Sequence, residues 1–264
     1  MTDDTPPEAP LTRTDNAGIT TLTLNRPVAH NTLSIALLSS LQTQLDQIAT
    51  DATTRVVIIA AQGKSFCAGH DVKEMRANPA RQAHQALFDQ CARMMLSIVN
   101  SPKPVIARVQ GMATAAGCQL VASCDLAIAS ESSGFCTPGV NIGLFCSTPM
   151  VALSRNVPRK VAMEMLLTGN VMTPATAAQW GLINRVVADD VLIDETEALA
   201  AQIASKSSMT LATGKKAYYE QIDMSLADAY SHTGRVMAEN MMAHDAIEGI
   251  DAFLEKRTPI WQDR

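Results

Sequence analysis

Two segments of this chain place a glycine-rich loop directly after the pattern of a buried strand. The apolar run Arg55–Ala61 precedes the loop Gly63–Met75, and the run Pro104–Val109 precedes the loop Gly111–Leu120. A continuous apolar run of this length is typical of a strand that is covered on both faces, as in a parallel sheet. Because parallel strands need helical crossovers, the alternation of strands and helices predicts an α/β fold with right-handed connections.

Each of these loops leads from a strand into a helix, where the first backbone N–H groups have no partner within the helix. Such donors, at the positive end of the helix dipole, stabilise an oxygen atom that gains negative charge in a reaction. Between Arg108 and Asp125 the only ionisable side chains are two cysteines, and the same holds between Glu131 and Arg155. The sequence therefore predicts an oxyanion hole without an obvious acid or base beside it.

The composition excludes several classes of protein. A chain of 264 residues with 47% hydrophobic residues can bury a full core. No apolar run approaches the ~18–20 residues that a membrane helix needs, and a net charge of -5 without a basic stripe argues against nucleic-acid binding. The six cysteines form no C-x-x-C pair and do not cluster with histidines, so we expect reduced thiols and no metal site. Met1–Pro10 resembles neither a secretory signal nor a transit peptide, which predicts a cytoplasmic protein.

Three regions are expected along the chain: a flexible arm over residues 1–16, a core over 17–188 and a helical oligomerisation region over 189–264. In the core, Ile19–Leu24 and Asp125–Ala129 have the patterns of strands, and Ser34 is a candidate N-cap for an amphipathic helix. Further helices are predicted over residues 80–100, 116–123, 174–181, 190–205, 208–221, 225–242 and 244–256. The stripe of Met237, Met241 and Met242 indicates core or subunit interface rather than a cofactor site.

Five motifs in this order resemble the crotonase, or enoyl-CoA hydratase/isomerase, superfamily, and the resemblance extends from Ile19 to Trp261. The motifs are Asn25-Arg26-Pro27 with Asn31-Thr32-Leu33, Phe66-Cys67-Ala68-Gly69-His70-Asp71-Val72, Ala115-Ala116-Gly117-Cys118-Gln119 with Cys124-Asp125, Thr173-Pro174-Ala175 with Gly181-Leu182-Ile183, and Ala252-Phe253-Leu254-Glu255-Lys256-Arg257. Residues 113–125 and 137–141 resemble in particular the branch of the enoyl-CoA hydratase domain-containing proteins 3.

The resemblance implies a spiral of β-β-α repeats with a C-terminal helical trimerisation region, and a homotrimer or a dimer of trimers. It implies an acyl-CoA thioester as substrate, with coenzyme A as part of that substrate and no permanently bound cofactor. The motifs place the oxyanion hole on the backbone N–H groups of His70 and Ala116. The positions that the resemblance assigns to coenzyme A binding are Val28, His30, Ala68, Asp71, Val72, Met112, Phe253 and Lys256; for Lys256, a solvated helix end is the alternative.

The sequence departs from the family at the two positions where hydratases carry glutamates, which align with Gln119 and Gly139. Glutamine can orient water but cannot accept its proton, and glycine supplies only space. A general acid or base typically contributes about 10²–10⁴-fold, so hydration is expected to be close to background. Either the ring of His70, with an unperturbed pKa of about 6.5, substitutes for a carboxylate, or this residue contributes only its backbone N–H.

Other polar residues near the predicted pocket leave two interpretations open. Asn141 and Thr137 either bind substrate or fix a turn. Cys118, Cys136 and Cys146 have no Lys or Arg nearby in the sequence that would lower a thiol pKa, which favours packing over nucleophilic chemistry.

The sequence thus predicts an acyl-CoA-binding lyase or isomerase in which His70 and Ala116 hold the thioester oxygen of an enolate. Gln119 and Asn141 would orient the reacting group. The alternatives are a decarboxylase of a carboxylated acyl-CoA, similar in its Ala-Gly-His-Asp loop, and a non-catalytic acyl-CoA sensor or scaffold.

Overall fold

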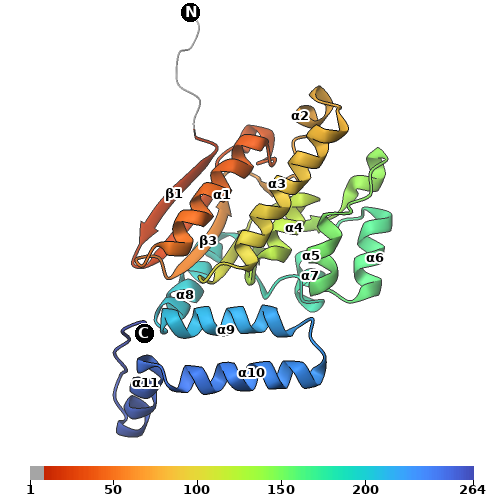
Figure 1. The fold of residues 1–264 in the computed structure, drawn as a ribbon. Coiled ribbons are helices and arrows are strands. Elements are labelled where there is room, and N and C mark those ends of the chain that lie inside the picture. The colour runs from red at the N-terminus through yellow and green to blue at the C-terminus, as the bar shows by residue number, and fades with distance from the viewer. Residues whose placement is uncertain (1–8) are drawn as a thin grey trace, which may run out of the picture.

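The computed structural model describes residues 9–264, and a six-stranded sheet forms its centre (Figure 1). The strand order is β1-β2-β3-β5-β7-β9. The first pair is antiparallel and the other four pairs are parallel, as the alternation of strands and helices predicts. The strands are β1 (Leu11–Asn16), β2 (Ile19–Leu24), β3 (Val56–Ala61), β5 (Val105–Val109), β7 (Leu126–Ser130) and β9 (Arg185–Val187).

A second, smaller sheet is built from three short parallel strands in the order β4-β6-β8. These strands are β4 (Ser65–Cys67), β6 (Met112–Thr114) and β8 (Gly134–Cys136). Each follows a strand of the large sheet after a short turn, and each is followed by helix. The chain therefore repeats a β-β-α unit, and the predicted spiral of such repeats is confirmed.

Helices cover both faces of the large sheet. Along β3, Val57 and Ile59 belong to the main core with the helix α1, whereas Val56 and Ile58 pack in a second cluster that includes Ala200 of α8. The predicted cap of α1 is present, since the Ser34 hydroxyl accepts a hydrogen bond from the Leu37 N–H. The α-helices of the core are α1 (Ile35–Thr50), α2 (Val72–Ala77), α3 (Arg81–Val99), α4 (Ala116–Ser123), α5 (Pro149–Asn156), α6 (Arg159–Thr168), α7 (Pro174–Gln179) and α8 (Leu192–Ala204). Three 3₁₀ turns complete the set: η1 (Pro27–Ala29), η2 (Pro138–Ile142) and η3 (Asp189–Val191).

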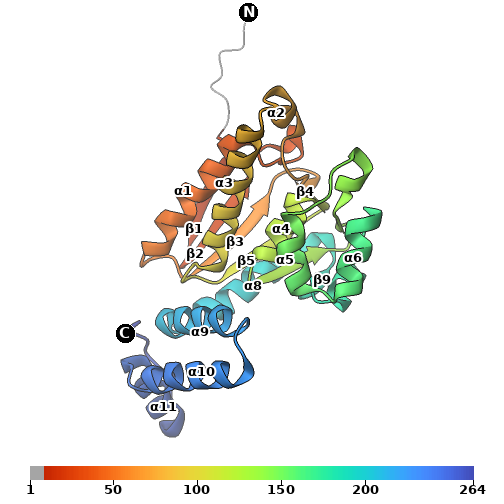
Figure 2. The ribbon, with the colours of Figure 1, turned by 45° about the vertical axis from the view of Figure 1, so that its right-hand side comes forward.

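The last three helices form a layer of their own below the core (Figures 1 and 2). They are α9 (Ser208–Gln221), α10 (Leu226–Met241) and α11 (His244–Glu255). None of the side chains of α10 is buried within the single chain. The exposed apolar side chains on this layer include Leu226, Tyr230, Met237, Met242, Phe253 and Leu254. The predicted helical C-terminal region is confirmed, and its role in trimerisation stays a prediction.

The structure differs from the expected flexible arm over residues 1–16. Leu11–Asn16 forms the edge strand β1, which pairs with β2 along its whole length. The sequence signal of β1 is weak because most of its side chains are polar and face solvent. Its pairing with β2 is what makes this segment a strand. Residues 1–8 of the arm lie outside the described residues. Within the described part of the chain, no helix is both long and apolar enough to cross a membrane.

Candidate active site

The candidate residues lie where the three strands of the small sheet end. Register pairs Cys67 with Ala113 and Thr114 with Cys136, so the carboxyl ends of β4, β6 and β8 share one edge. The segments that leave this edge are 68–70, 115–116 and 137–139. Ligands of α/β sheets bind outside the carboxyl ends of the strands, and the small sheet thus gathers the predicted site into one place.

The N–H group of Ala116 is free at the start of α4. Ala115 has φ 49° and ψ -117°, and it provides no side-chain cap for the helix. The N–H of Ala115 donates to the Cys136 carbonyl, but that of Ala116 has no acceptor among residues 9–264. Gly117 lets α4 begin this close to β4, because a Cβ at this position would overlap the Cys67 carbonyl. The strained turn at Ala115 therefore presents an unpaired donor at a helix N-terminus.

The N–H group of His70 is freed by a partner that lies far away in the sequence. Leu33 and His70 form an isolated parallel bridge, in which the Leu33 N–H donates to the Gly69 carbonyl at 2.8 Å and the Asp71 N–H donates to the Leu33 carbonyl at 3.4 Å. In a parallel bridge, the intervening residue points its own N–H away from the partner. The His70 N–H consequently faces away from Leu33, and no acceptor within the described residues receives it.

The two loops that carry these donors touch. A Cβ built on Gly69 would lie 2.9 Å from the Ala115 Cβ and 3.4 Å from the Ala116 nitrogen. Gly69 has φ +87°, which favours glycine, and the contact leaves no room for another side chain. The two unpaired amides therefore lie on adjacent loops, which makes them candidates for the donors of an oxyanion hole.

The ring of His70 is largely buried and packs edge-on against Phe88 of α3, with ring centroids 5.5 Å apart. Burial lowers the pKa of His70, and the nearby Leu33 carbonyl opposes this shift only in part. Neither ring nitrogen reaches a hydrogen-bond partner in the described structure. The ring is therefore neutral near pH 7 and has one donor and one acceptor to offer to a ligand.

Two more buried polar atoms around this edge have no partner among the described residues. They are Oε1 of Gln119, whose residue is 6% exposed, and Oγ1 of the fully buried Thr137. Buried polar atoms without partners are rare and cost about 1–3 kcal/mol each. Such atoms are expected where a bound molecule or water completes the hydrogen bonds.

Gly139 could not simply be replaced by a larger residue. A Cβ at this position in η2 would lie 2.8 Å from the Leu144 carbonyl and 2.9 Å from the Cys146 sulfur. The Leu144 N–H also donates to the Gly139 carbonyl, which closes the loop over this glycine. The loop is thus built around a residue without a side chain.

The thiols of this region are held in the protonated form. Burial raises the pKa of Cys118 to about 12 and that of Cys136 to about 11. It also raises the pKa of Cys146, although the Gly139 backbone partly opposes it. Because the thiolate is the nucleophile, these values support the packing interpretation for all three. Within the described residues, no cluster of His, Cys, Asp or Glu is placed to hold a metal ion.

The structure gives several of the predicted coenzyme A positions other neighbours. The Asp71 carboxylate is engaged inside the protein, where it accepts from Arg26 and caps α2. Val28 on η1 is 99% exposed and Val72 is half exposed. The Ala68 N–H donates to the carbonyl of the exposed His30, so these two adjoin.

The remaining predicted residues are not gathered with this group. Met112 is half-buried within β6. Phe253 on α11 and Lys256 directly after this helix are exposed. Helix α11 lies at the opposite end of the molecule from α2 in both views (Figures 1 and 2). Asn141 is exposed and turns toward Gly169 after α6, since its Nδ2 would lie 3.1 Å from a Cβ there.

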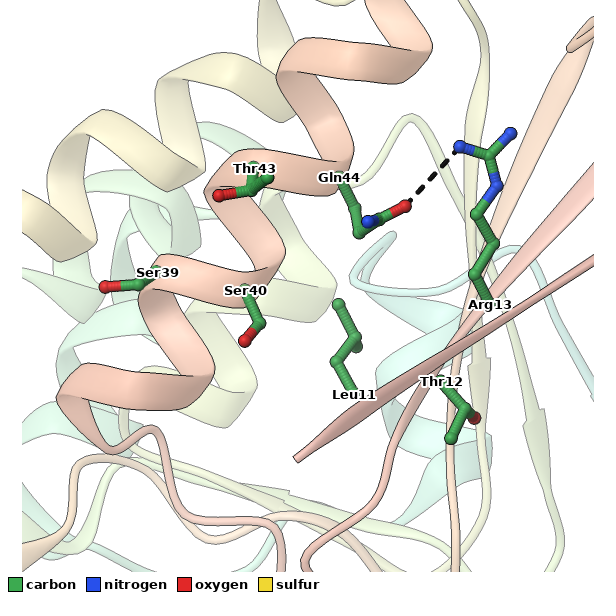
Figure 3. Close-up of a pocket in the computed structure, with 7 residues that line it drawn as sticks. All are labelled: Leu11, Thr12, Arg13, Ser39, Ser40, Thr43 and Gln44. Carbon is green, nitrogen blue, oxygen red and sulfur yellow. Dashed lines mark hydrogen bonds between the residues drawn. The ribbon is translucent and has the colours of Figure 1, made fainter. Parts of the chain in front are cut away.

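A cleft of about 390 Å³ lies elsewhere, between β1 and α1 (Figure 3). Ser39, Ser40, Thr43 and Gln44 line it from α1, and Arg13 lines it from β1. Several of its polar groups are bound within the protein, as in the contact between Arg13 and Gln44. The sequence did not indicate this cleft or the packing of Phe88 against His70. Both depend on contacts between elements that are distant in the chain.

Replacing Ala115 by glycine tests the strain at the oxyanion loop. We expect Ala115→Gly to raise the free energy of unfolding by about 1 kcal/mol, because relief of the positive φ exceeds the added chain entropy. Chemical denaturation measures this change. Ala122→Gly in the last turn of α4 is the matched control and should be destabilising. An equal loss in both variants would contradict strain at Ala115.

Comparison with known proteins shows the family to which this chain belongs. A family model described as "Enoyl-CoA hydratase/isomerase" matches residues 14–264. The human protein "Enoyl-CoA hydratase domain-containing protein 3, mitochondrial" is 48% identical over 92% of this chain and 80% of its own length. The "2,3-dehydroadipyl-CoA hydratase" of Escherichia coli is 32% identical over 92% of this chain and 94% of its own length.

Two solved structures superpose closely. An enoyl-CoA hydratase of Mycobacterium smegmatis has a TM-score of 0.94 and 52% identity over 96% of this chain and 99% of its own. The human enoyl-CoA hydratase domain-containing protein 3 has a TM-score of 0.94 and 47% identity over 96% of this chain and 100% of its own. Fold and matches together define a protein with the crotonase fold. Within that class, the chain belongs to the enoyl-CoA hydratase/isomerase family, and the resemblance to the domain-containing protein 3 branch is confirmed.

The prediction of a cytoplasmic protein is wrong by the same comparisons. The relatives from Xenopus laevis, Rattus norvegicus, Homo sapiens and Danio rerio are all named as mitochondrial proteins, which favours that compartment over the cytoplasm. The prediction rested on the composition of Met1–Pro10 and on the expectation that the six cysteines are reduced thiols. Compartment is not a property that the fold or its core encodes.

Proposed function

We propose that this chain is an acyl-CoA-binding enzyme that stabilises a thioester enolate between the N–H groups of His70 and Ala116. The observation that carries the proposal is the pair of unpaired amides on two touching loops at one sheet edge. A thioester oxygen becomes negatively charged when its α-carbon loses a proton or a carboxylate group. Donors of this kind are worth about 2.7–4 kcal/mol each in well-studied enzymes.

The polar groups around the hole are neutral. Gln119 orients a reacting group or water through its amide, and the unpaired nitrogens of His70 accept or donate one proton. A lyase or isomerase reaction fits these groups, including loss of carbon dioxide from a carboxylated acyl-CoA, which needs no base. Hydration by two carboxylates does not fit, because Gln119 and Gly139 occupy the family positions.

The second candidate is a non-catalytic acyl-CoA sensor or scaffold. Gln119 and Gly139 favour this candidate, since a protein without acid–base groups at these positions can retain the pocket and bind thioesters. Tight binding of many acyl-CoA thioesters without turnover of any would support the sensor, whereas turnover that His70→Ala abolishes would exclude it.

The apolar layer of α9–α11 supports a further part of the proposal. We expect three copies, or two stacked trimers, to cover this surface, and Phe253 and Lys256 to reach the coenzyme A of a neighbouring copy. Residues 17–188 would then form the acyl-CoA core and residues 189–264 the oligomerisation region. Light scattering of the pure protein measures the mass of the assembly, and a monomer would contradict this part.

Crotonyl-CoA distinguishes hydration from other chemistry. We expect the wild type to leave the conjugated enoyl absorbance almost unchanged, at about 10²-fold or more below a two-glutamate enzyme. Gln119→Glu is the comparison variant and should gain activity, whereas Gly139→Glu is unsuitable because its Cβ would push against Leu144 and Cys146. Fast hydration by the wild type would show that Gln119 or His70 activates water and would overturn the argument from the missing carboxylates.

A further inference from the structure

We propose that Arg26 is a positioning residue for the oxyanion hole, because its guanidinium fixes the loop that presents the His70 N–H. The inference rests on the proposed function, since it requires a hole at His70 and Ala116. It assigns a role to an arginine whose side chain binds Thr32 and Asp71, the residues on either side of the bridge between Leu33 and His70.

Arg26 binds both sides of the bridge that orients His70. Its Nη1 donates to the Thr32 carbonyl at 2.6 Å and its Nη2 donates to the Asp71 carboxylate at 3.1 Å. Thr32 precedes Leu33 and Asp71 follows His70, so one planar side chain spans the bridge between Leu33 and His70.

The two hydrogen bonds of the bridge differ in length. Its upstream hydrogen bond, from the Leu33 N–H to the Gly69 carbonyl, is 2.8 Å long, whereas the downstream one, from the Asp71 N–H to the Leu33 carbonyl, is 3.4 Å. Hydrogen bonds near 3.5 Å contribute little. The contact of Arg26 with Asp71 lies on this weaker side, one peptide after the one that carries the His70 N–H. Its contact with the Thr32 carbonyl holds the peptide whose N–H, that of Leu33, binds the Gly69 carbonyl, and this carbonyl shares a peptide with the His70 N–H.

Asn31 fixes the backbone of Arg26 in turn. The fully buried Asn31 accepts from the Arg26 N–H at 2.8 Å and donates to the carbonyls of Gln62 and Ser65, each at 2.8 Å. Ser65 begins β4, which leads directly to the His70 loop. Through Asn31, the backbone of Arg26 is therefore linked to β4, and the Arg26 side chain binds the loop that follows β4.

A lysine could not reproduce these contacts. The guanidinium is planar and directs separate N–H groups to two acceptors, whereas an ammonium is a single point of charge. The side chains of Arg26 and Asp71 are 25% and 14% exposed, so solvent screens the pair only in part. The contact with Arg26 lowers the pKa of Asp71 although burial opposes that shift, and the carboxylate stays charged.

Arg13 offers a matched control. Its side chain is also 25% exposed, and it pairs with Asp15 and Asp51 at 2.9 Å each. It lies on β1, the edge strand of the large sheet, beside the cleft of Figure 3, and makes no hydrogen bond to a residue of the small sheet within the described residues. Arg13→Lys therefore reports the general cost of weakening an arginine ion pair near the N-terminus.

The test measures polarisation of a bound thioester, which does not require turnover. Butyryl-CoA labelled with ¹³C at the thioester carbon is bound to wild type, Arg26→Lys and Arg13→Lys, and infrared difference spectra record the carbonyl stretch. We expect a shift to lower frequency in wild type and Arg13→Lys, and less than about half of that shift in Arg26→Lys, with the dissociation constant changed by less than about threefold. Where a substrate is turned over, kcat should fall about 10–100-fold with little change in KM.

Each outcome decides the matter. A full shift in Arg26→Lys would overturn the inference and leave the oxyanion hole intact. An equal loss of the carbonyl shift in Arg13→Lys, at the same thermal stability as Arg26→Lys, would also overturn the inference. A general destabilisation by the loss of any arginine ion pair would then explain the smaller shift. A wild type without any shift would show that the proposed hole itself is wrong, and the inference would fail with it.

Discussion

Replacing Ala116 by proline is expected to lower kcat for the true substrate by about 10²–10³-fold, which is the cost of removing one oxyanion donor. Proline has no N–H, and the first position of a helix tolerates it. The His70 amide would remain, so a residual rate is expected. The dissociation constant for a non-reacting acyl-CoA should change far less, since the lost interaction strengthens only as the oxygen gains charge.

Ala116→Gly is the matched control for this variant because it keeps the amide. It should retain most of the activity and so separate the donor from the side chain. Thermal unfolding of both variants checks that the unusual conformation of Ala115 survives the proline. An unchanged kcat in a folded Ala116→Pro protein would contradict the oxyanion hole and favour the sensor.

The sequence predicts best those elements whose signals are local. The bounds of α4 agree with the expected 116–123, and α9 agrees with 208–221. In α1, the capping hydroxyl of Ser34 and the apolar spacing of the helix suffice to define it. In each case the side chains that determine the element lie within it.

The residue patterns alone do not predict the small sheet, and only the family resemblance, through its β-β-α repeats, implied the second strand of each repeat. Its strands are only three residues long, and β4 and β8 carry no alternating pattern that could be read alone. They exist because neighbouring turns of the spiral pair with one another. Edge strand β1 was missed for a related reason, since its pairing with β2 rather than its composition makes it a strand.

The candidate site divides in the same way. The free N–H of Ala116 follows from a local strand–loop–helix pattern, and the sequence predicts it. The free N–H of His70 depends on the bridge with Leu33, which is distant in the chain. No local pattern predicts this bridge, and only the family resemblance indicates His70 as a donor. Burial lowers the pKa of the His70 ring, which packs against Phe88, and no local signal in the sequence predicts that contact.

Asp125 joins the end of α4 to the C-terminal layer. Its carboxylate accepts from Lys215 at 2.7 Å, from the Val105 N–H at 2.7 Å and from the Tyr219 hydroxyl at 2.9 Å. The Lys215 ammonium also donates to the carbonyls of Ile98 and Lys103. These contacts give Asp125 a structural role, because they dock α9 against the core.

Asp125→Ala is therefore expected to lower the free energy of unfolding by about 3–5 kcal/mol, because it leaves the charge of a buried lysine uncompensated. Denaturant unfolding measures the loss, and hydrogen exchange should show it first in α9. The double variant Asp125→Ala/Lys215→Met should recover part of the stability, since no unpaired charge then remains. Lys216→Met, one residue further on and 74% exposed, should stay within about 0.5 kcal/mol of the wild type. If Asp125→Ala cost no more than Lys216→Met, the ion pair would not be what holds the C-terminal layer to the core.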